Sequence, residues 1–383
     1  MQLNRIEQTY RRLQFEGRPI DILWSGNPNE QGLHFPSEIL TELYRRYFEK
    51  PYYRPHPKGL PEARRAVAEY YAAQGAPIDS ENIVLCSGTS EAFFYLFRQL
   101  AETGDNFLAP NPAYPLFDSI AELARVELRH YPLRENRGWS LDLEALQALA
   151  DFRTRGILLI SPNNPTGAVA DAEEISRLAH WANSRNLPLI CDEVFSEFYF
   201  GAGTFPRPLA LAKPELCFTL NGISKMFALP ALKLAWIAVS GNDSKVATAV
   251  DRLETSADTF LSCHTPIQEA LPQLFAAGRD FLRNYRETVR QRKELAVERL
   301  RAEATLGFTE PQGGFYLIFE ILESLPCSEE DFIIGLMEKT GVFLHPGYFF
   351  DYERGIHGVL SFLTAADILQ SGIDRLRHFI HSF

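Results

Sequence analysis

The stretch that decides the fold reads Asn221-Gly-Ile-Ser-Lys225-Met-Phe-Ala-Leu-Pro-Ala-Leu-Lys233 and lies between two apolar runs, Leu216–Leu220 and Leu234–Val239. Short apolar runs of this kind are typical of buried strands, so Lys225 is predicted to lie in a loop beside the edge of a buried sheet. Burial favours the neutral amine of a lysine, and a neutral amine is a nucleophile toward aldehydes. The segment therefore indicates a reactive lysine at the edge of a sheet.

Further apolar runs alternate with helical patterns through the middle of the chain. They predict strands at Asn82–Cys86, Asn106–Ala109, Gly156–Ile160 and Leu187–Cys191, and helices at Glu91–Ala101, Leu116–Ala124, Leu143–Ala150 and Ala172–Arg185. Such alternation implies a largely parallel sheet covered on both faces. The expected fold is α/β, with a mostly parallel seven-stranded sheet sandwiched by helices and a smaller α+β domain from both chain ends. The expected division is 1–45 for an N-terminal arm and part of the small domain, 46–280 for the large domain and 281–383 for the C-terminal small domain.

The composition narrows the class of protein. The 383-residue chain is 46% hydrophobic and 23% charged, and its formal net charge is −11. The acidic balance argues against a nucleic-acid partner, because phosphate binding depends on Lys and Arg. No apolar run approaches the ~20 residues that a membrane span needs, and the N-terminus does not resemble a signal peptide. We therefore expect a cytoplasmic protein without a membrane partner.

The five cysteines are scattered and odd in number, at positions 86, 191, 217, 263 and 327. Three of them lie in apolar runs, so they are interpreted as reduced core residues and not as a disulfide set or a metal cluster. No metal site is predicted.

Four polar motifs follow predicted strands. Ser87-Gly88-Thr89-Ser90 opens a helix, where free N–H groups and hydroxyls favour an anion, although the motif alone is more typical of an ordinary helix cap. Tyr114 stands between prolines and can stack on a flat ring, although alone it would be interpreted as a packed loop residue. Asn164 belongs to an Asn-Pro-Thr-Gly turn, and Asp192 ends an apolar run, where a buried carboxylate needs a partner.

In this order and spacing, these motifs resemble the class I/II aminotransferases of fold type I, which use pyridoxal 5′-phosphate. The resemblance runs from about Asp21 to Phe383. It implies a Schiff base between Lys225 and the cofactor, and transfer of an amino group between an amino acid or related amine and an oxo acid. Lyase or decarboxylase chemistry on the same fold remains the alternative, because the cofactor supports several reactions.

The resemblance also assigns cofactor roles to particular residues. Asn164 is expected to donate to the phenolate oxygen of the cofactor, Asp192 to pair with the pyridine nitrogen and Tyr114 to stack on the ring. The phosphate is expected to contact Gly88, Thr89, Ser90, Ser224, Lys233 and, from the partner subunit of a homodimer with shared active sites, Tyr53. Tyr52 is the alternative for this last position. Lys233 stands where the family usually has an arginine, so it keeps the charge without the bidentate fork.

Two positions depart from the family pattern. Phe195 replaces a common tyrosine that donates to the phenolate oxygen. Val359, in His357-Gly-Val-Leu-Ser-Phe362, stands where an arginine usually binds the substrate carboxylate. Either another cation takes that role or the substrate lacks the group. Arg354 is preferred among the candidates, with His357, Arg54 and Lys58 as alternatives, and Asn27 is a further candidate for substrate binding.

Two other classes of protein fit the sequence less well. A transcription regulator that binds the same cofactor carries a helix-turn-helix module ahead of this domain, and the chain has neither room for one nor the basic charge that DNA binding favours. A nucleotide-binding Rossmann protein is disfavoured because no Gly-x-Gly-x-x-Gly motif follows a strand.

Overall fold

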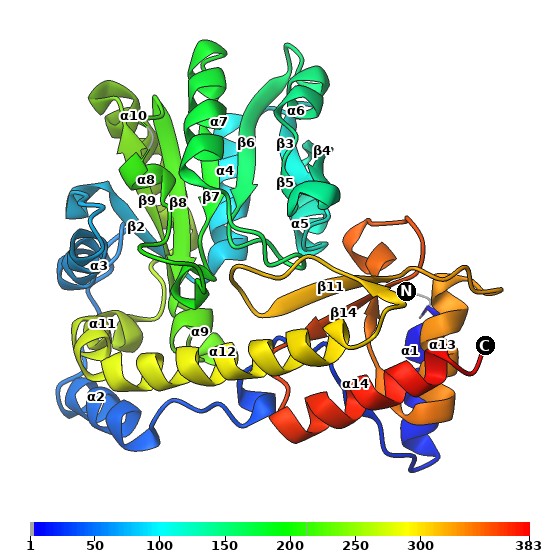
Figure 1. Cartoon of the computed structure of the whole chain (residues 1–383). Coiled ribbons are helices and arrows are strands. Elements are labelled where there is room, and N and C mark those ends of the chain that lie inside the picture. The colour runs from blue at the N-terminus through cyan, green and yellow to red at the C-terminus, as the bar shows by residue number, and fades with distance from the viewer. Residues whose placement is uncertain (1–3, 212) are drawn as a thin grey trace.

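The computed structural model describes residues 4–211 and 213–383. Residues 1–3 of the predicted N-terminal arm lie outside this part. The structure contains a large sheet with helices on both faces, and a smaller sheet that lies near the long helix α12 (Arg279–Arg301) (Figure 1).

The large sheet has the strand order β2-β9-β8-β7-β6-β3-β4-β5. The neighbours from β8 to β4 pair in parallel, whereas β9 is antiparallel to both of its neighbours and β5 is antiparallel to β4. The strands are β2 (Ile83–Cys86), β3 (Asn106–Asn111), β4 (Glu127–Arg134), β5 (Ser140–Leu141), β6 (Thr154–Ile160), β7 (Leu189–Asp192), β8 (Leu216–Gly222) and β9 (Ala235–Gly241). The predicted α/β class is confirmed. The sheet has eight strands where seven were predicted. No apolar run marked the half-exposed β4 or the two-residue edge strand β5.

Helices bury both faces of this sheet, which explains why its central strands are almost wholly apolar. One face is covered by α4 (Thr89–Leu100), α5 (Leu116–Ala124) and α10 (Asp243–Phe260). The other face is covered by α3 (Pro61–Ala73), α6 (Leu143–Leu149), α7 (Ala172–Ser184) and α11 (Thr265–Ala277). Helix α2 (Ser37–Glu49) packs on α11.

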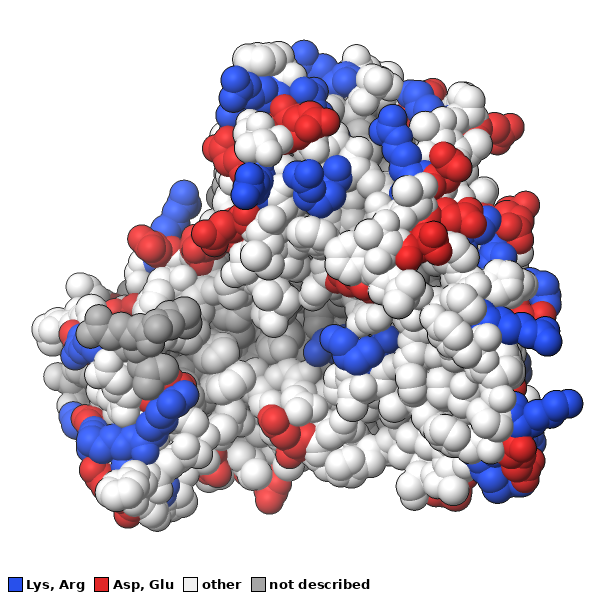
Figure 2. Space-filling model, turned by 180° about the vertical axis from the view of Figure 1, so that it is seen from behind, with Lys and Arg blue, Asp and Glu red and all other residues white. Residues whose placement is uncertain are grey.

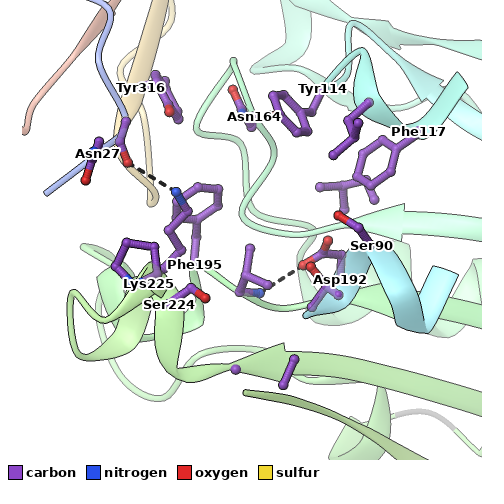
Figure 3. Close-up of a pocket in the computed structure, with 18 of the residues that line it drawn as sticks. Asn27, Ser90, Tyr114, Phe117, Asn164, Asp192, Phe195, Ser224, Lys225 and Tyr316 are labelled. Atoms are coloured by element: carbon purple, nitrogen blue, oxygen red, sulfur yellow. Dashed lines mark hydrogen bonds between the residues drawn. The ribbon is translucent and has the colours of Figure 1, made fainter. Parts of the chain in front are cut away.

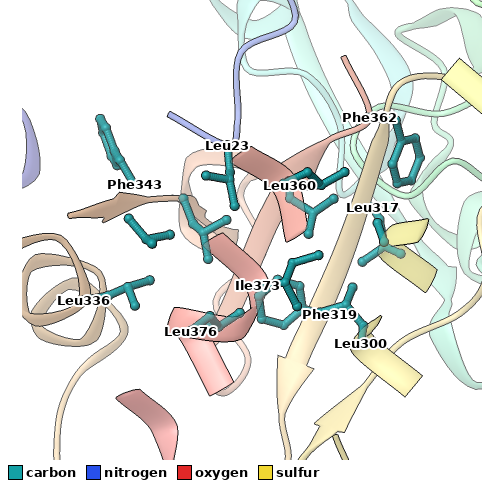
Figure 4. Packing of buried hydrophobic residues seen from close by; sticks show 14 of the residues in the cluster. Leu23, Leu300, Leu317, Phe319, Leu336, Phe343, Leu360, Phe362, Ile373 and Leu376 are labelled. Carbon is teal, nitrogen blue, oxygen red and sulfur yellow. The ribbon is translucent and has the colours of Figure 1, made fainter. Parts of the chain in front are cut away.

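The smaller sheet has the order β10-β11-β14-β13, with all pairs antiparallel. Its strands are β10 (Leu306–Gly307), β11 (Tyr316–Ile321), β13 (His345–Pro346) and β14 (His357–Ser361). Its core is shared with α1 (Arg5–Phe15), α12, α13 (Glu329–Thr340) and α14 (Ala366–Ile380), and Figure 4 shows Leu317, Leu360 and Ile373 meeting inside it. The chain ends meet here, because β1 (Asp21–Ile22) pairs in parallel with β12 (Val342–Phe343).

All five cysteines are free thiols, and four of them are buried. Within residues 4–211 and 213–383, no helix is both long and apolar enough to cross a bilayer. On the face of the molecule shown in Figure 2, positive and negative side chains are interspersed around its edges.

Candidate active site

A cavity of about 580 Å³ lies beside the carboxyl ends of β6, β7 and β8. In α/β sheets this edge is where ligands bind. The other walls come from residues 24–30 and from the small sheet, so the cavity lies between the two sheets (Figure 3). Nine of the residues predicted from the sequence line it, namely Asn27, Thr89, Ser90, Tyr114, Asn164, Asp192, Phe195, Ser224 and Lys225.

Lys225 was predicted to lie in a loop, but it lies in the short helix α9 (Ile223–Met226), a single turn that begins directly after β8. Its Nζ donates a hydrogen bond to the Gly26 carbonyl oxygen at 3.1 Å. Burial lowers the pKa of Lys225 to about 8, although the charge of Asp192 opposes this shift. A side chain on Gly26 would displace the Tyr316 ring, because a Cβ there would lie 1.7 Å from the Tyr316 hydroxyl oxygen. Because the pKa of Lys225 is about 8, part of its population is a neutral amine near neutral pH.

Asp192 is the last residue of β7 and is only 5% exposed. Burial raises the pKa of its carboxyl group to about 7, and the neighbouring Glu193 adds to the rise. The Val194 N–H donates to Asp192 Oδ1 at 3.0 Å, and this bond, together with the charge of Lys225, partly offsets the cost of burial. A cationic or N–H group that entered the cavity would stabilise the carboxylate further.

Asn164 follows β6 in a turn, and hydrogen bonds of its neighbour Asn163 hold this turn in place. The Thr166 hydroxyl donates to Asn163 Oδ1 at 2.9 Å, and Asn163 Nδ2 donates to the Pro112 carbonyl oxygen at 3.3 Å. The Oδ1 atom of Asn164 is buried and has no hydrogen-bond partner within the described chain. Buried polar atoms normally have a partner, so this amide is suited to a bound polar group.

The N-terminus of α4 lies at the cavity wall. Gly88 precedes the helix with φ 141°, a conformation that L side chains rarely adopt, and Thr89 and Ser90 line the cavity just beyond it. Lys233 Nζ lies 3.6 Å from the position that a Cβ on Gly88 would occupy. The Lys233 ammonium therefore lies close to the N-terminus of α4, where the helix dipole and free N–H groups favour an anion.

Comparisons with known proteins identify the family of the chain. The family described as Aminotransferase class I and II matches residues 52–368. The chain is a class I/II aminotransferase. It is 27% identical over 379 residues to the glutamate-pyruvate aminotransferase AlaA of Escherichia coli (strain K12), a match that covers 97% of this chain and 93% of that protein.

Two further relatives support this assignment. Nicotianamine aminotransferase A of Hordeum vulgare is 27% identical over 335 residues, which cover 84% of this chain and 71% of that protein. The structure of an alanine aminotransferase from Pyrococcus furiosus superposes with a TM-score of 0.93 at 25% identity, covering 99% of this chain and 96% of that one. The predicted transaminase activity is confirmed, and no relative named here is a lyase or a decarboxylase.

Two aromatic rings shape the walls of the aminotransferase cavity. Phe195, at the position where a tyrosine is common, is 5% exposed and packs edge-on against Phe315, with ring centroids 4.9 Å apart. The Lys225 Nζ lies 5.9 Å from the centroid of the Phe195 ring. Tyr114 is 44% exposed, packs edge-on against Phe117 and lines the cavity.

The position of the missing arginine is filled by an apolar cluster. Val359 is fully buried and packs with Trp139, Phe350 and Tyr352. Its cross-strand partner His345 lines the cavity and stacks on Trp24, with ring centroids 4.0 Å apart. Burial lowers the pKa of His345 to about 3, so the imidazole is neutral. Neither valine nor a neutral imidazole replaces the charge of an arginine.

The remaining candidates for a carboxylate-binding cation do not line the cavity. Arg354 and Arg54 are exposed, and the Lys58 ammonium pairs with Glu81 at 2.9 Å. His357 is buried, and burial lowers the pKa of its imidazole to about 4, so it too is neutral. Among the described residues that form the cavity wall, Lys225 is the only lysine or arginine. Tyr53 is 68% exposed and does not line the cavity of its own subunit.

Sequence reasoning missed several lining residues because they come from distant segments. Trp24, Glu30, Tyr316, His345 and Phe350 all face the cavity. The Trp24 indole Nε1 is buried without a hydrogen-bond partner among the described residues, and Glu30 accepts a hydrogen bond from the Ser25 hydroxyl at 2.9 Å. No local motif marks these residues. They become visible only when the small sheet is placed against the large one.

Proposed function

We propose that this aminotransferase holds pyridoxal 5′-phosphate in the cavity, with Lys225 as the residue that reacts with it. The observation that carries the proposal is the arrangement of three groups around one cavity: a buried lysine with a lowered pKa, a buried carboxylate with a raised pKa and a buried amide whose Oδ1 atom has no partner within the described chain. When bound, the cofactor supplies an aldehyde for the substrate amine and a ring that withdraws electrons from the reacting carbon.

The residues present fit this cofactor from end to end. The phosphate would be held by Gly88, Thr89, Ser90, Ser224 and Lys233. Thr89, Ser90 and Ser224 line the cavity, and the Lys233 ammonium lies close to Gly88. Asp192 would hold the protonated ring nitrogen, and the Asn164 amide would bind the phenolic oxygen. Tyr114 would pack against the ring face. Phe195 offers no hydrogen bond at this oxygen, so Asn164 alone would supply the side-chain donor there.

Lys225 would also move the proton that transamination requires. Its lowered pKa keeps part of the amine neutral at physiological pH, so it can take a proton from the substrate carbon that bears the amino group. The hydrogen bond to the Gly26 carbonyl holds the amine at the cavity wall. Borohydride reduction of the loaded enzyme and peptide mass mapping test the proposal: an adduct on Lys225 supports it, and an unmodified Lys225 contradicts it.

Asp192→Asn is expected to stabilise the cofactor-free protein while weakening cofactor binding. The folded pKa of about 7 exceeds the ordinary value of 3.8, so stability is lost as pH rises from about 4 through 7. Asparagine removes that cost, and the free energy of unfolding at pH 8 should rise by about 2 kcal/mol. The affinity for pyridoxal phosphate should fall tenfold to hundredfold, since a charge-assisted hydrogen bond is lost (about 1.5–3 kcal/mol).

Denaturant unfolding and a cofactor titration measure the two effects of Asp192→Asn. The stabilisation should shrink at pH 4.5, where the wild-type carboxyl group is protonated in the folded state. A variant that is less stable than the wild type at pH 8 would contradict the expected cost of the buried charge.

We propose that Arg354 binds the substrate carboxylate once substrate is present, as the sequence favours. Because this side chain is exposed, its contribution should be modest. Arg354→Ala is expected to raise KM for amino-acid donors about three- to tenfold with little change in kcat. An amine donor without a carboxylate is the control, and its KM should not change. An unchanged KM for amino acids would remove Arg354 from consideration.

We also propose a cytoplasmic homodimer with shared active sites, in which Tyr53 reaches the cofactor phosphate of the partner subunit. Its high exposure leaves the hydroxyl free for such a contact, and the free thiols fit a reducing compartment. The boundaries 1–45, 46–280 and 281–383 remain part of this proposal. We expect a small amino donor and an oxo acceptor as substrates, with no nucleic-acid or membrane partner.

A further inference from the structure

Two glutamates and a histidine converge on the flank of the small sheet, outside the wall of the active-site cavity. Glu320 of β11 and His357 of β14 are direct cross-strand partners, on neighbouring strands of the small sheet. Glu135 comes from the 3₁₀ turn Glu135–Arg137 that follows β4 of the large sheet. One ligand atom from each residue lies within 4.8 Å of the others.

The histidine in this cluster lacks the partners that a buried imidazole needs. His357 is 1% exposed, and neither ring nitrogen has a hydrogen-bond partner within the described residues. The nearest other acid is Glu329, whose Oε1 lies 3.8 Å from Nδ1, beyond hydrogen-bond distance. That carboxylate already accepts bonds from the backbone N–H groups of Gly347, Tyr348 and His357 itself. An unpaired buried polar group is costly, so a bound species is the natural partner for the ring.

The two glutamates face each other without a counter-ion. Among residues 4–211 and 213–383, neither Glu320 nor Glu135 forms an ion pair, and Glu320 accepts no hydrogen bond. Glu135 accepts one bond, from the Tyr352 hydroxyl at 2.5 Å. Gly355 lies directly against the cluster, because a Cβ on this residue would lie 2.9 Å from Glu320 Oε1. Two carboxylates this close repel each other, and a cation between them would relieve that repulsion.

We propose that Glu135, Glu320 and His357 bind a divalent transition-metal ion of the Zn²⁺ type. One imidazole and two carboxylates form a ligand set that suits such ions, whereas Mg²⁺ and Ca²⁺ prefer oxygen ligands alone. Ligand atoms around a tetrahedral Zn²⁺ lie about 3.3 Å apart. The present separations of up to 4.8 Å exceed this value, so the glutamate side chains would have to turn toward the ion when it binds. A water molecule would complete the coordination.

A second cluster of two acids and one histidine differs from the first in that its histidine is hydrogen-bonded. Asp118, His130 and Asp351 also bring their ligand atoms within 4.8 Å of one another. There, however, His130 Nε2 lies 2.9 Å from Asp118 Oδ1 and Nδ1 lies 3.4 Å from the Pro110 carbonyl oxygen. Both ring nitrogens of His130 are paired, so this cluster needs no ion and provides an internal control.

The ion would connect the two sheets. Glu135 belongs to a turn of the large sheet, and the other two ligands belong to the small sheet. His357 is also two residues before Val359, at the position where the family arginine is missing. A metal at this point would fix β14 relative to the large sheet without entering the substrate cavity, so its effect should be on stability more than on the chemical step.

Isothermal titration of the tag-free, chelator-treated full-length protein with ZnCl₂ tests the proposal. We expect one saturable site per chain that Glu320→Gln and His357→Gln each weaken at least tenfold, while His130→Gln leaves it unchanged. Zn²⁺ should also raise the Tm of the wild type, and excess Mg²⁺ should not. Because Glu320 is partly exposed, its glutamine variant should fold even if the histidine variant does not. No saturable binding, or equal binding by Glu320→Gln, would overturn the proposal.

Discussion

Lys225→Ala is expected to lower kcat for transamination by about 10³-fold or more. A positioned acid–base group contributes about 10²–10⁴-fold, and this lysine is also the proposed nucleophile. Its amine is held 3.1 Å from the Gly26 carbonyl oxygen and has a pKa of about 8. No other lysine or arginine of the described chain lines the cavity. The assay measures formation of the oxo product at saturating amino donor and saturating added pyridoxal phosphate.

Two lysine variants serve as controls for this loss. Lys245 pairs with Glu215 at 3.2 Å and does not line the cavity, so Lys245→Ala should leave kcat unchanged. Lys233→Ala should weaken cofactor binding, and its kcat should recover when the cofactor is in excess, because this lysine lies close to Gly88 in the proposed phosphate site. If Lys225→Ala kept more than a tenth of the wild-type kcat with excess cofactor, the base would have to be another group.

The part of the site that the sequence predicts best follows strands of the large sheet. Asp192 ends β7, while Asn164 and Lys225 follow β6 and β8 within a few residues. Parallel strands bring their carboxyl ends to one edge, so the order of apolar runs was enough to place these side chains near one another. The edge strands of the large sheet were harder to predict from the sequence. β4 is largely exposed or half-buried, so it lacks the apolar run that marks a strand.

The substrate side of the cavity depends on contacts between distant segments. Trp24 stacks on His345, across more than three hundred residues of sequence. Val359 is buried under Trp139, which comes from a loop of the large sheet. The sequence indicated the loss of the arginine, but it could not indicate that an apolar cluster takes its place. Cross-strand register, which sets His345 opposite Val359, is a property of the assembled small sheet.

Arg207→Ala is expected to destabilise the protein by about 3–5 kcal/mol, the usual cost of removing one partner of a buried ion pair. Arg207 and Glu193 form such a pair, with side chains 2% and 1% exposed. The guanidinium also contacts Gln74 and lies over the rings of Tyr71 and Phe205, at 5.3 and 5.2 Å from their centroids. Urea unfolding at pH 7 measures the change. Arg286→Ala removes an exposed arginine 3.9 Å from Glu197 and should change stability by less than about 0.5 kcal/mol.

The cause of this loss can be separated by pH and by a second substitution. Burial raises the pKa of Glu193, and the charge of Arg207 opposes that rise, so the carboxyl group of Arg207→Ala should take up a proton more readily. A raised folded pKa means that stability falls as pH rises above the ordinary value of 4.5, so the deficit should be smaller at pH 5 than at pH 8. Adding Glu193→Gln should recover part of the stability at pH 8. The loss of stability could instead be the same at both pH values and in the double variant. In that case its cause would be the lost packing of the guanidinium, and not the unpaired charge of Glu193 next to Asp192.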